Sequence, residues 1–394
     1  MFKLFIINVI TVCKCLVLLS SILITASKQD TNINVLDLSA KYGHPATSHD
    51  VTTEDGYILQ LFHIPVQTQQ KRPVLLMHGM TDTADTWLVR GNGSLAITLA
   101  NAGYDVWLGN CRGNRYARRH TYLDPDKDSS FWDFSFHDHG VYDLPAIIDK
   151  ILELTGSKKI DAIGHSQGNT IFYVLGSSKP EYNAKVNLMI ALAPVGYLHN
   201  IGSPLSDIFS IFPKLNKILK TLNVHELFNK KTLPGKILNV VCSSDIGYEM
   251  CVERFLFEIT GFDPEEFGQD FFEIINTYFP SSTSRKNIDH FAQVYNRKSF
   301  AKYDYGYRNK AIYNAREPPQ YNLGNVTMKI AFIVALNDKL TPLKDVNILR
   351  KQLPNLVNYT VSPRKTFNHI SFVWGENMDE YLFPFIFDLL KTYN

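Results

Sequence analysis

The sequence predicts an α/β fold in which a mostly parallel sheet carries helices on both faces and a helical cap is inserted late in the chain. Short apolar runs alternate with helix-like segments up to residue 195, the alternation stops over residues 196–321, and it resumes over residues 322–394. Strands that alternate with helices are typical of a parallel sheet covered on both faces. We therefore expect residues 28–195 and 322–394 to form one core, with the cap between them.

The strands of this core are predicted from short, continuous apolar runs. Runs of this length are typical of strands that are buried on both faces of a sheet. They comprise residues 73–77, 104–108, 159–163, 186–194, 329–334 and 357–361.

Three helices are predicted to cover the sheet. We expect Asp143 to cap the first, because an acid at the cap, Pro145 in the first turn and Gly156 at the end are typical of helix boundaries. The other two are predicted over residues 169–175 and 378–393.

Composition excludes several classes of protein. Of the 394 residues, 45% are hydrophobic and 20% are charged, which fits a globular chain rather than a disordered one. The formal net charge of +2 is too small to indicate nucleic-acid binding. The sequence contains no Walker loop, H-E-x-x-H, paired C-x-x-C or G-x-G-x-x-G motif. We therefore expect no metal, no nucleotide and no other cofactor.

The first 27 residues are predicted to be a secretory signal peptide. Lys3 opens a short basic end, residues 15–25 are almost all apolar, and the small Ala26 and Ser27 follow. The alternative is an uncleaved membrane anchor over residues 4–25, but Lys14 would place a charge in its middle, where it is costly. The expected location is therefore secreted or lysosomal.

Removal of this segment leaves three cysteines, Cys111, Cys242 and Cys251. An odd number in a secreted chain suggests one disulfide and one free thiol. Cys242 and Cys251 are close enough in sequence to close a small loop, and three unpaired thiols are the alternative. Secretion also gives meaning to three N-glycosylation sequons, at Asn92, Asn325 and Asn358.

Ser166 is the predicted nucleophile. It lies in Gly164-His165-Ser166-Gln167-Gly168, between a predicted strand and a predicted helix. In this context the turn is so sharp that only small residues fit two positions before and after the serine. The turn raises the hydroxyl above the sheet, beside a helix N-terminus that favours developing negative charge.

A serine needs a base, and the base needs a carboxylate to orient it. In this strand–serine–helix arrangement the chain order is serine, acid, histidine. Asp338 follows the strand at 329–334. The alternative role for Asp338 is a helix cap, but Thr341 and Pro342 already form a good cap and first turn. Of the four histidines after Ser166, only His369 follows Asp338. We therefore predict a Ser166–Asp338–His369 triad.

Acyl transfer also requires donors for the oxyanion. One is the main-chain N–H of Gln167, the residue after the nucleophile. The other is expected from the loop after an early strand, where the N–H of Met80 is the candidate. The alternative for His78-Gly79, just before Met80, is a purely structural turn.

These motifs, with others along the chain, resemble the acid lipases, the family of gastric and lysosomal lipases and their insect relatives. The resemblance extends over roughly residues 38–390. The other matching segments are the opening hairpin at 50–59, Leu108-Gly-Asn-Cys-Arg-Gly-Asn114, Tyr116-Ala-Arg-Arg119, Phe131-Trp-Asp-Phe-Ser-Phe136, Tyr142-Asp-Leu-Pro145 and Asn368-His-Ile-Ser-Phe-Val-Trp374.

The resemblance implies a capped α/β-hydrolase that hydrolyses carboxylic esters of neutral lipids. It assigns the nucleophile, acid and base to the three triad residues, gives Met80 and Gln167 the oxyanion role, and implies a Cys242–Cys251 disulfide. Two departures from the family pattern are Ala335, where a glycine is usual, and His137-Asp-His-Gly140, where a glutamate usually follows the first histidine.

The resemblance also implies that residues 230–258 form a mobile lid. The expected partner is a lipid substrate at an oil–water or membrane interface, and we expect a monomer. A basic face of the cap is either solvated or helps docking on anionic lipid. Its basic residues are Lys214, Lys217, Lys220, Lys230, Lys231 and Lys236.

Three other functions are alternatives to a neutral-lipid lipase. They are a carboxylesterase for smaller esters, a peptidase and a non-catalytic lipid-binding relative.

Overall fold

The computed structural model describes residues 33–66, 71–244 and 246–393. The predicted signal peptide at residues 1–27 lies outside them. Within the described part of the chain, no helix combines the length and apolar character needed to cross a membrane.

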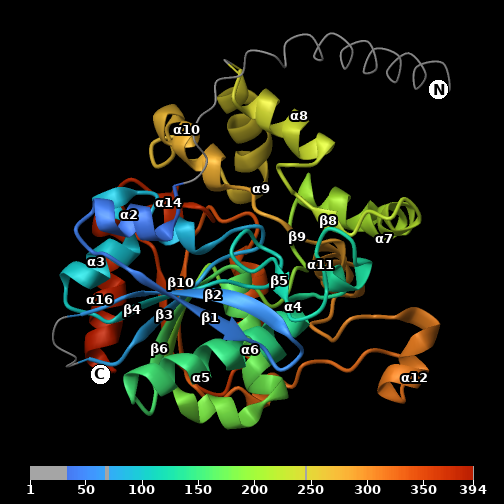
Figure 1. The fold of residues 1–394 in the computed structure, drawn as a ribbon, viewed down its shortest axis with the longest axis horizontal. Coiled ribbons are helices and arrows are strands. Elements are labelled where there is room, and N and C mark those ends of the chain that lie inside the picture. Colours follow the sequence, from blue (N-terminus) through green and yellow to red (C-terminus); the bar gives the residue numbers. More distant parts are fainter. Residues whose placement is uncertain (1–32, 67–70, 245, 394) are drawn as a thin grey trace.

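A twisted sheet runs through the centre of the molecule (Figure 1). Its strands follow the spatial order β1-β2-β4-β3-β6-β7-β10-β11, and β5 pairs with β2. Neighbours from β4 to β11 are parallel, whereas β2 is antiparallel to β1, β4 and β5. The bounds are β1 Thr47–Thr52, β2 Tyr57–Ile64, β3 Val74–Met77, β4 Val106–Gly109, β5 Arg119–His120, β6 Ile160–His165, β7 Val186–Leu192, β10 Lys329–Val334 and β11 Leu356–Val361.

Two apolar clusters, one on each face of the sheet, form the core. In β3, Leu75 and Met77 join one cluster while Val74 and Leu76 join the other, because successive side chains of a strand point to opposite faces. This explains the continuous apolar runs of the sequence. Helices α5 (Leu144–Thr155) and α6 (Gln167–Ser178) cover the first face, and α3 (Leu95–Asn101) and α16 (Phe383–Thr392) cover the second.

The predicted α/β fold is confirmed, and the six predicted strands are present to within two residues at each end. The prediction of one helix over residues 378–393 is wrong in detail. The chain forms α15 (Met378–Tyr381) and α16, which Leu382 separates with non-helical dihedral angles. Smaller core helices are α2 Val35–Lys41, α4 Phe136–Asp138, α13 Leu343–Arg350 and α14 Ser371–Trp374.

The prediction that Asp143 caps a helix is also wrong. A π-helical turn over His139–Asp143 runs directly into α5, so Asp143 is already in helical conformation and its side chain caps nothing. Its carboxylate instead accepts hydrogen bonds from the main-chain N–H and Nε of Arg112, at 2.9 and 2.7 Å. The buried Arg112 also pairs with Asp55, which follows β1. Asp143 therefore forms an ion pair in the core and does not cap a helix.

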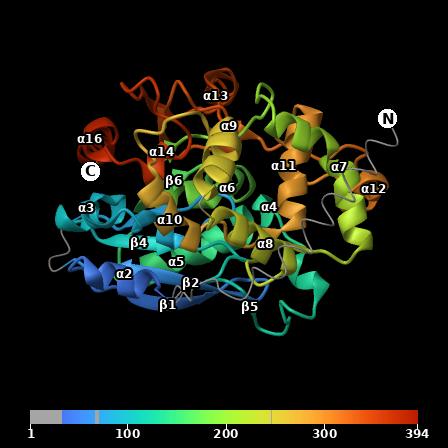
Figure 2. The same ribbon diagram turned by 90° about the horizontal axis from the view of Figure 1, so that it is seen from above.

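The segment between β7 and β10 is mainly helical and includes a small antiparallel sheet of two strands, β8 (Glu226–Leu227) and β9 (Thr283–Ser284). Figures 1 and 2 show α7 beside α11, and Figure 1 shows α8 and α5 on opposite sides of the molecule. A π-helical turn, Tyr248–Leu256, follows α8. The helices are α7 Leu205–Thr221, α8 Leu233–Cys242, α9 Phe257–Thr260, α10 Gln269–Tyr278, α11 Arg285–Arg297 and α12 Asn309–Tyr313.

Candidate active site

Ser166 lies in the turn between β6 and α6. Its backbone has φ 55° and ψ −119°, a conformation that non-glycine residues rarely adopt. A Cβ added to Gly168 would lie 2.2 Å from the carbonyl oxygen of Met77, and one added to Gly164 would lie 2.7 Å from that of Gly168. Only glycine fits at these two positions, and the tight packing holds Ser166 in its strained geometry.

The structure brings the three predicted triad residues together. The Oγ of Ser166 is 2.9 Å from Nε2 of His369, and Nδ1 of His369 is 2.8 Å from Oδ2 of Asp338. All three residues are buried. Asp338 follows β10 and His369 follows β11, so neighbouring parallel strands deliver the acid and the base to the same edge of the sheet as Ser166. This arrangement can transfer a proton from the serine while it attacks a carbonyl carbon.

Asp338 is held in its ionised form by its surroundings. Burial opposes ionisation, but His369 and Thr341 together outweigh it and keep the pKa of the Asp338 carboxyl below its usual value. Thr341 donates to Asp338 through its hydroxyl, at 2.5 Å, and its main-chain N–H, at 2.7 Å. The sequence-based interpretation of Thr341 as a helix cap is therefore wrong, because α13 begins after Pro342 and receives no side-chain cap.

His165 supports the base from the other side. Its Nε2 lies 2.8 Å from the carbonyl oxygen of His369, so this nitrogen carries a proton and donates it. Burial lowers the pKa of His165 to about 3. A neutral His165 can therefore position His369 without repelling the positive charge that His369 would acquire in its predicted role as the base.

The two predicted oxyanion donors belong to elements that meet at Ser166. Gln167 is the first residue of α6, where the main-chain N–H has no partner within the helix. The loop that carries Met80 passes close to the nucleophile, since a Cβ added to Gly79 would lie 3.4 Å from the Cβ of Ser166.

His78 holds that loop in shape. Its Nδ1 donates to the carbonyl oxygen of Gly79 at 2.7 Å, and its Nε2 accepts from the N–H of Cys111 at 3.2 Å and from Asn114. Burial lowers the pKa of His78 to about 4, so the ring keeps one donor and one acceptor nitrogen. His78 and Gly79 thus form a structural turn that also presents Met80 beside the serine.

Two residues that the sequence analysis did not assign contact Gln167. Asn287, in cap helix α11, donates to its Oε1 at 2.7 Å, and Nε2 of Gln167 lies 3.3 Å from Nδ1 of His139. All three residues are buried. His139 belongs to the segment that departs from the family pattern, which was the only sequence signal; nothing in the sequence pointed to Asn287. The cap therefore reaches a residue with a predicted oxyanion role.

Comparison with known proteins identifies the family. Residues 35–91 match the partial α/β-hydrolase lipase region, and residues 72–376 match the α/β-hydrolase fold. The chain is 40% identical to Lipase 1 of Drosophila melanogaster, an alignment that covers 90% of this chain and 79% of that one. It is 36% identical to the gastric triacylglycerol lipase of Mus musculus, covering 88% of each. The chain belongs to the α/β-hydrolase lipase family. It is an ester hydrolase, and the predicted resemblance is confirmed.

Solved structures support the fold of this lipase-family chain. A thermophilic esterase from Thermogutta terrifontis superposes with a TM-score of 0.51, covering 88% of this chain and 99% of that one at 14% identity. At this level of identity the likeness concerns the fold alone.

The disulfide and sequon positions can also be located in this lipase-family structure. Cys242, at the end of α8, forms a disulfide with Cys251 in the following π-helical turn, while Cys111 is free and buried in the core. Asn92 and Asn325 are exposed, whereas Asn358 is half-buried in β11 and accepts a hydrogen bond from Thr360.

Among the described residues, no group of three histidine, cysteine or acidic side chains could hold a metal ion.

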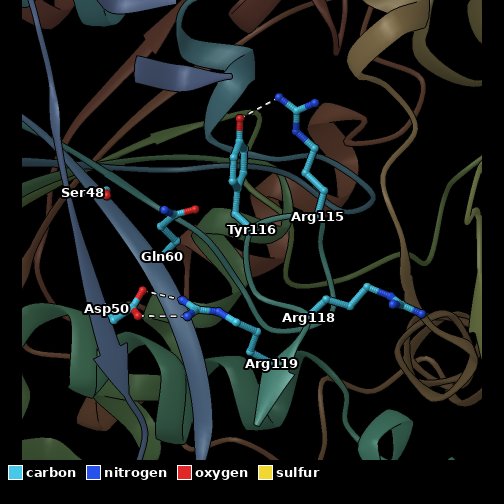
Figure 3. Close-up of a pocket in the computed structure, with 7 residues that line it drawn as sticks. All are labelled: Ser48, Asp50, Gln60, Arg115, Tyr116, Arg118 and Arg119. Atoms are coloured by element: carbon cyan, nitrogen blue, oxygen red, sulfur yellow. Dashed lines mark hydrogen bonds and ion pairs between the residues drawn. The ribbon is translucent and has the colours of Figure 1, made fainter. Parts of the chain in front are cut away.

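A polar cavity of about 590 Å³ lies beside β1 and β2 (Figure 3), and none of the triad residues lines it. Its arginines are neutralised, since Arg119 pairs with Asp50, Arg115 with Asp85 and Arg118 with Glu226 of β8. The cavity is therefore unsuited to an acyl chain, and Arg118 links the core to the cap. The lining residues are Ser48, Asp50, Gln60, Arg115, Tyr116, Arg118 and Arg119.

Proposed function

We propose that this enzyme hydrolyses carboxylic esters of neutral lipids, triacylglycerols or steryl esters, with Ser166, His369 and Asp338 as its catalytic triad. The hydrogen-bonded chain from Ser166 through His369 to Asp338, at 2.9 and 2.8 Å, carries the catalytic part of the proposal. Similarity to a gastric triacylglycerol lipase supports the neutral-lipid part.

The reaction takes place in two halves. Nε2 of His369 accepts the Ser166 proton as Oγ bonds to the ester carbonyl carbon, and the oxyanion accepts hydrogen bonds from the N–H groups of Met80 and Gln167. The carbon–oxygen bond to the alcohol then breaks, and His369 gives its proton to the departing alcohol. In the second half, water loses a proton to His369 as it adds to the acyl carbon. The bond between that carbon and Oγ then breaks, Oγ takes the proton back from His369, and the fatty acid leaves.

A lid is part of this proposal. A long-chain ester is presented at an oil surface, and the apolar entrance that accepts it would be an exposed patch in water. Residues 230–258, which contain the Cys242–Cys251 loop, cover the entrance and move aside at lipid. We further propose that the enzyme is a monomer that is secreted or lysosomal after removal of residues 1–27, with glycans on the exposed sequons.

A panel of substrates tests the proposal. The purified protein should hydrolyse emulsified triolein or a cholesteryl ester, and its rate on a partly soluble ester should rise steeply once the substrate passes its solubility limit. Activity only on a dissolved short p-nitrophenyl ester, with a plain hyperbolic rate curve, would identify a carboxylesterase instead. Cleavage of a peptide would identify a peptidase, and no turnover would identify a non-catalytic relative.

Ser166→Ala should lower kcat by about a million-fold, since the attacking oxygen is lost. An organophosphonate should label the parent protein and not this variant. Ser39→Ala is the matched control, because Ser39 is also a buried serine but belongs to no part of the proposed site and to no sequon. Labelling that persists in Ser166→Ala would assign the nucleophile to another serine.

A further inference from the structure

Helix α7 of the cap has more apolar surface than its packing uses. Phe209 and Phe212 face inward and are buried in the core, and Asn296 of α11 donates to the carbonyl oxygen of Phe209 at 2.7 Å. These contacts account for one face of the helix. A helix that packs on a single neighbour normally exposes charged and polar residues over the rest of its surface.

The outer surface of α7 instead carries a stripe of large apolar residues. The four side chains follow one another at intervals of four, three and four residues, so they lie along one side of the helix. The last of them is the C-cap residue. Their exposed fractions are 59% for Ile211, 38% for Leu215, 57% for Ile218 and 67% for Leu222.

A row of lysines follows the same helix. Lys214, Lys217 and Lys220 are exposed and three residues apart, so they run round the helix from the edge of the stripe, at Lys214, to the side away from it, at Lys220. Within the described part of the chain, none of them forms an ion pair. The one acidic residue of α7, Asp207, lies in the first turn and accepts a hydrogen bond from Ser203. One edge of the stripe is thus flanked by Lys214, and the exposed surface beyond it carries further uncompensated positive charge.

We propose that α7 is a docking helix that binds the enzyme to an anionic lipid surface. The helix lies in the plane of the interface, with the stripe of Ile211, Leu215, Ile218 and Leu222 among the acyl chains. Lys214 then lies beside the headgroups, and Lys217 and Lys220 add positive charge within reach of the anionic surface. The combination of an apolar face and a lysine-rich polar face is typical of interfacial helices. The inference deepens the proposed function, because it assigns surface binding to a cap helix outside the lid at residues 230–258.

A second copy of the chain fits this face less well. A symmetric dimer through α7 would bring together two helices that each carry three lysines without ion pairs, and like charges at an interface are unfavourable. A lipid surface with anionic headgroups instead satisfies both features at once, since it removes the stripe from water and neutralises the lysines.

Flotation with vesicles of non-hydrolysable diether lipids tests the proposal on the whole mature protein. The vesicles contain phosphatidylcholine alone, or one phosphatidylglycerol for every four phosphatidylcholines. The double variant Ile218→Gln/Leu222→Gln should bind the anionic vesicles at least about tenfold more weakly than the parent protein, because two apolar side chains leave the acyl region. Leu154→Gln is the matched control, since Leu154 is 44% exposed on α5, away from α7, and its substitution should leave binding unchanged.

A triple variant separates the electrostatic contribution. Lys214→Gln/Lys217→Gln/Lys220→Gln should weaken binding to anionic vesicles by at least about tenfold and hardly affect binding to neutral ones. Thermal unfolding of each variant establishes that the fold is intact. Binding within twofold of the parent for both variants would overturn the proposal, as would a dimer in sedimentation velocity that only the stripe variant abolishes.

The vesicle measurement does not require catalysis. A protein that binds through α7 but hydrolyses no lipid ester would retain this inference and refute the proposed function. A protein that hydrolyses triolein, but whose stripe variant still binds vesicles, would support the proposed function and refute this inference.

Discussion

The segment that carries the proposed nucleophile and the segment proposed as the lid differ in how they are packed. Every residue from 160 to 176 is buried, which includes all of β6 and most of α6. Among the residues of 229–256 whose burial the structure describes, only Cys242, Gly247 and Val252 are buried. Strain at Ser166 persists because dense packing over-determines its backbone. In residues 229–256 a disulfide provides a constraint where packing is sparse.

This difference separates two requirements of a lipase. Proton transfer needs fixed distances between a few atoms, and close packing with buried hydrogen bonds supplies them. Contact with lipid needs exposed apolar surface and mobility, which sparse packing permits. We therefore expect substitutions in the core to change rates on every ester, and substitutions in the cap to discriminate between dissolved and emulsified esters.

After the loss predicted for Ser166→Ala, the largest effect is expected at Asp338. Asp338→Asn keeps the size of the side chain but loses the charge that orients His369 and stabilises its protonated form. We expect kcat to fall roughly ten-thousand-fold on dissolved and emulsified esters alike. Asp345→Asn is the control, since Asp345 is also buried and hydrogen-bonded, to Asn200, but does not contact the triad. A fall of less than about tenfold for Asp338→Asn would show that His369 does not depend on this carboxylate.

His165 should make the core sensitive to acid. The unfolded chain protonates this side chain below its ordinary pKa of 6.5, whereas the folded chain excludes the proton until pH falls to about 3. Acidification therefore favours the unfolded state, and His165 should lower the free energy of unfolding by about 1.4 kcal/mol for each pH unit between roughly pH 6 and pH 4.

The variant His165→Gln isolates this contribution. Its amide can still donate to the carbonyl oxygen of His369, but it does not titrate. Denaturant unfolding at several pH values should show the parent protein losing stability more steeply than the variant as pH falls, a difference of roughly a hundredfold in the unfolding constant over two pH units. Parallel stability curves would contradict the assignment.

Asn287 tests the connection between the two regions. Asn287→Ala removes the donor that holds the side chain of Gln167, whose main-chain N–H is a proposed oxyanion donor. We expect kcat on a dissolved ester to fall about tenfold with little change in KM, since transition-state stabilisation is weakened more than substrate binding.

A double-mutant cycle with Gln167→Ala, which retains the main-chain N–H, distinguishes positioning from a general loss of stability. If Asn287 acts through Gln167, the double variant should be no slower than the slower single variant. Independent, multiplicative effects would show that Asn287 acts elsewhere.

Much of the core could be predicted from the sequence because its signals are local. The strands are continuous apolar runs, and the glycines around Ser166 follow from the sharpness of one turn. Chain order selected Asp338 and His369, although their separation from Ser166 in sequence gave no direct information on distance. The structure places all three within hydrogen-bonding distance.

Two errors concern side chains whose partners are distant in sequence. Asp143 resembles a helix cap, but its carboxylate accepts a hydrogen bond from Arg112, 31 residues earlier in the chain. Lys230 was expected on a basic face that is either solvated or docks on lipid, but it donates to the carbonyl oxygen of Thr277 and burial lowers its pKa to about 8. In both cases a tertiary contact, which no local pattern encodes, overrides a local preference. Thr341 is a different case, since its partner Asp338 is only three residues away and the sequence suggested a helix cap instead of this local hydrogen bond.

The smallest effect on dissolved esters is expected from the disulfide. Cys242→Ser/Cys251→Ser removes the bridge between α8 and the following π-helical turn, a segment that packing alone restrains weakly. Because the triad lies in the core, the rate on a dissolved p-nitrophenyl ester should stay within about threefold of the parent, while proteolysis within residues 233–256 should become faster. Hydrolysis of emulsified triolein should fall further, since the lid loses its shape.

Cys111→Ala is the control, as it removes a free thiol from the core and should not expose the cap to protease. An equal loss on both substrates would show that this segment supports the triad itself and that core and cap are not separable.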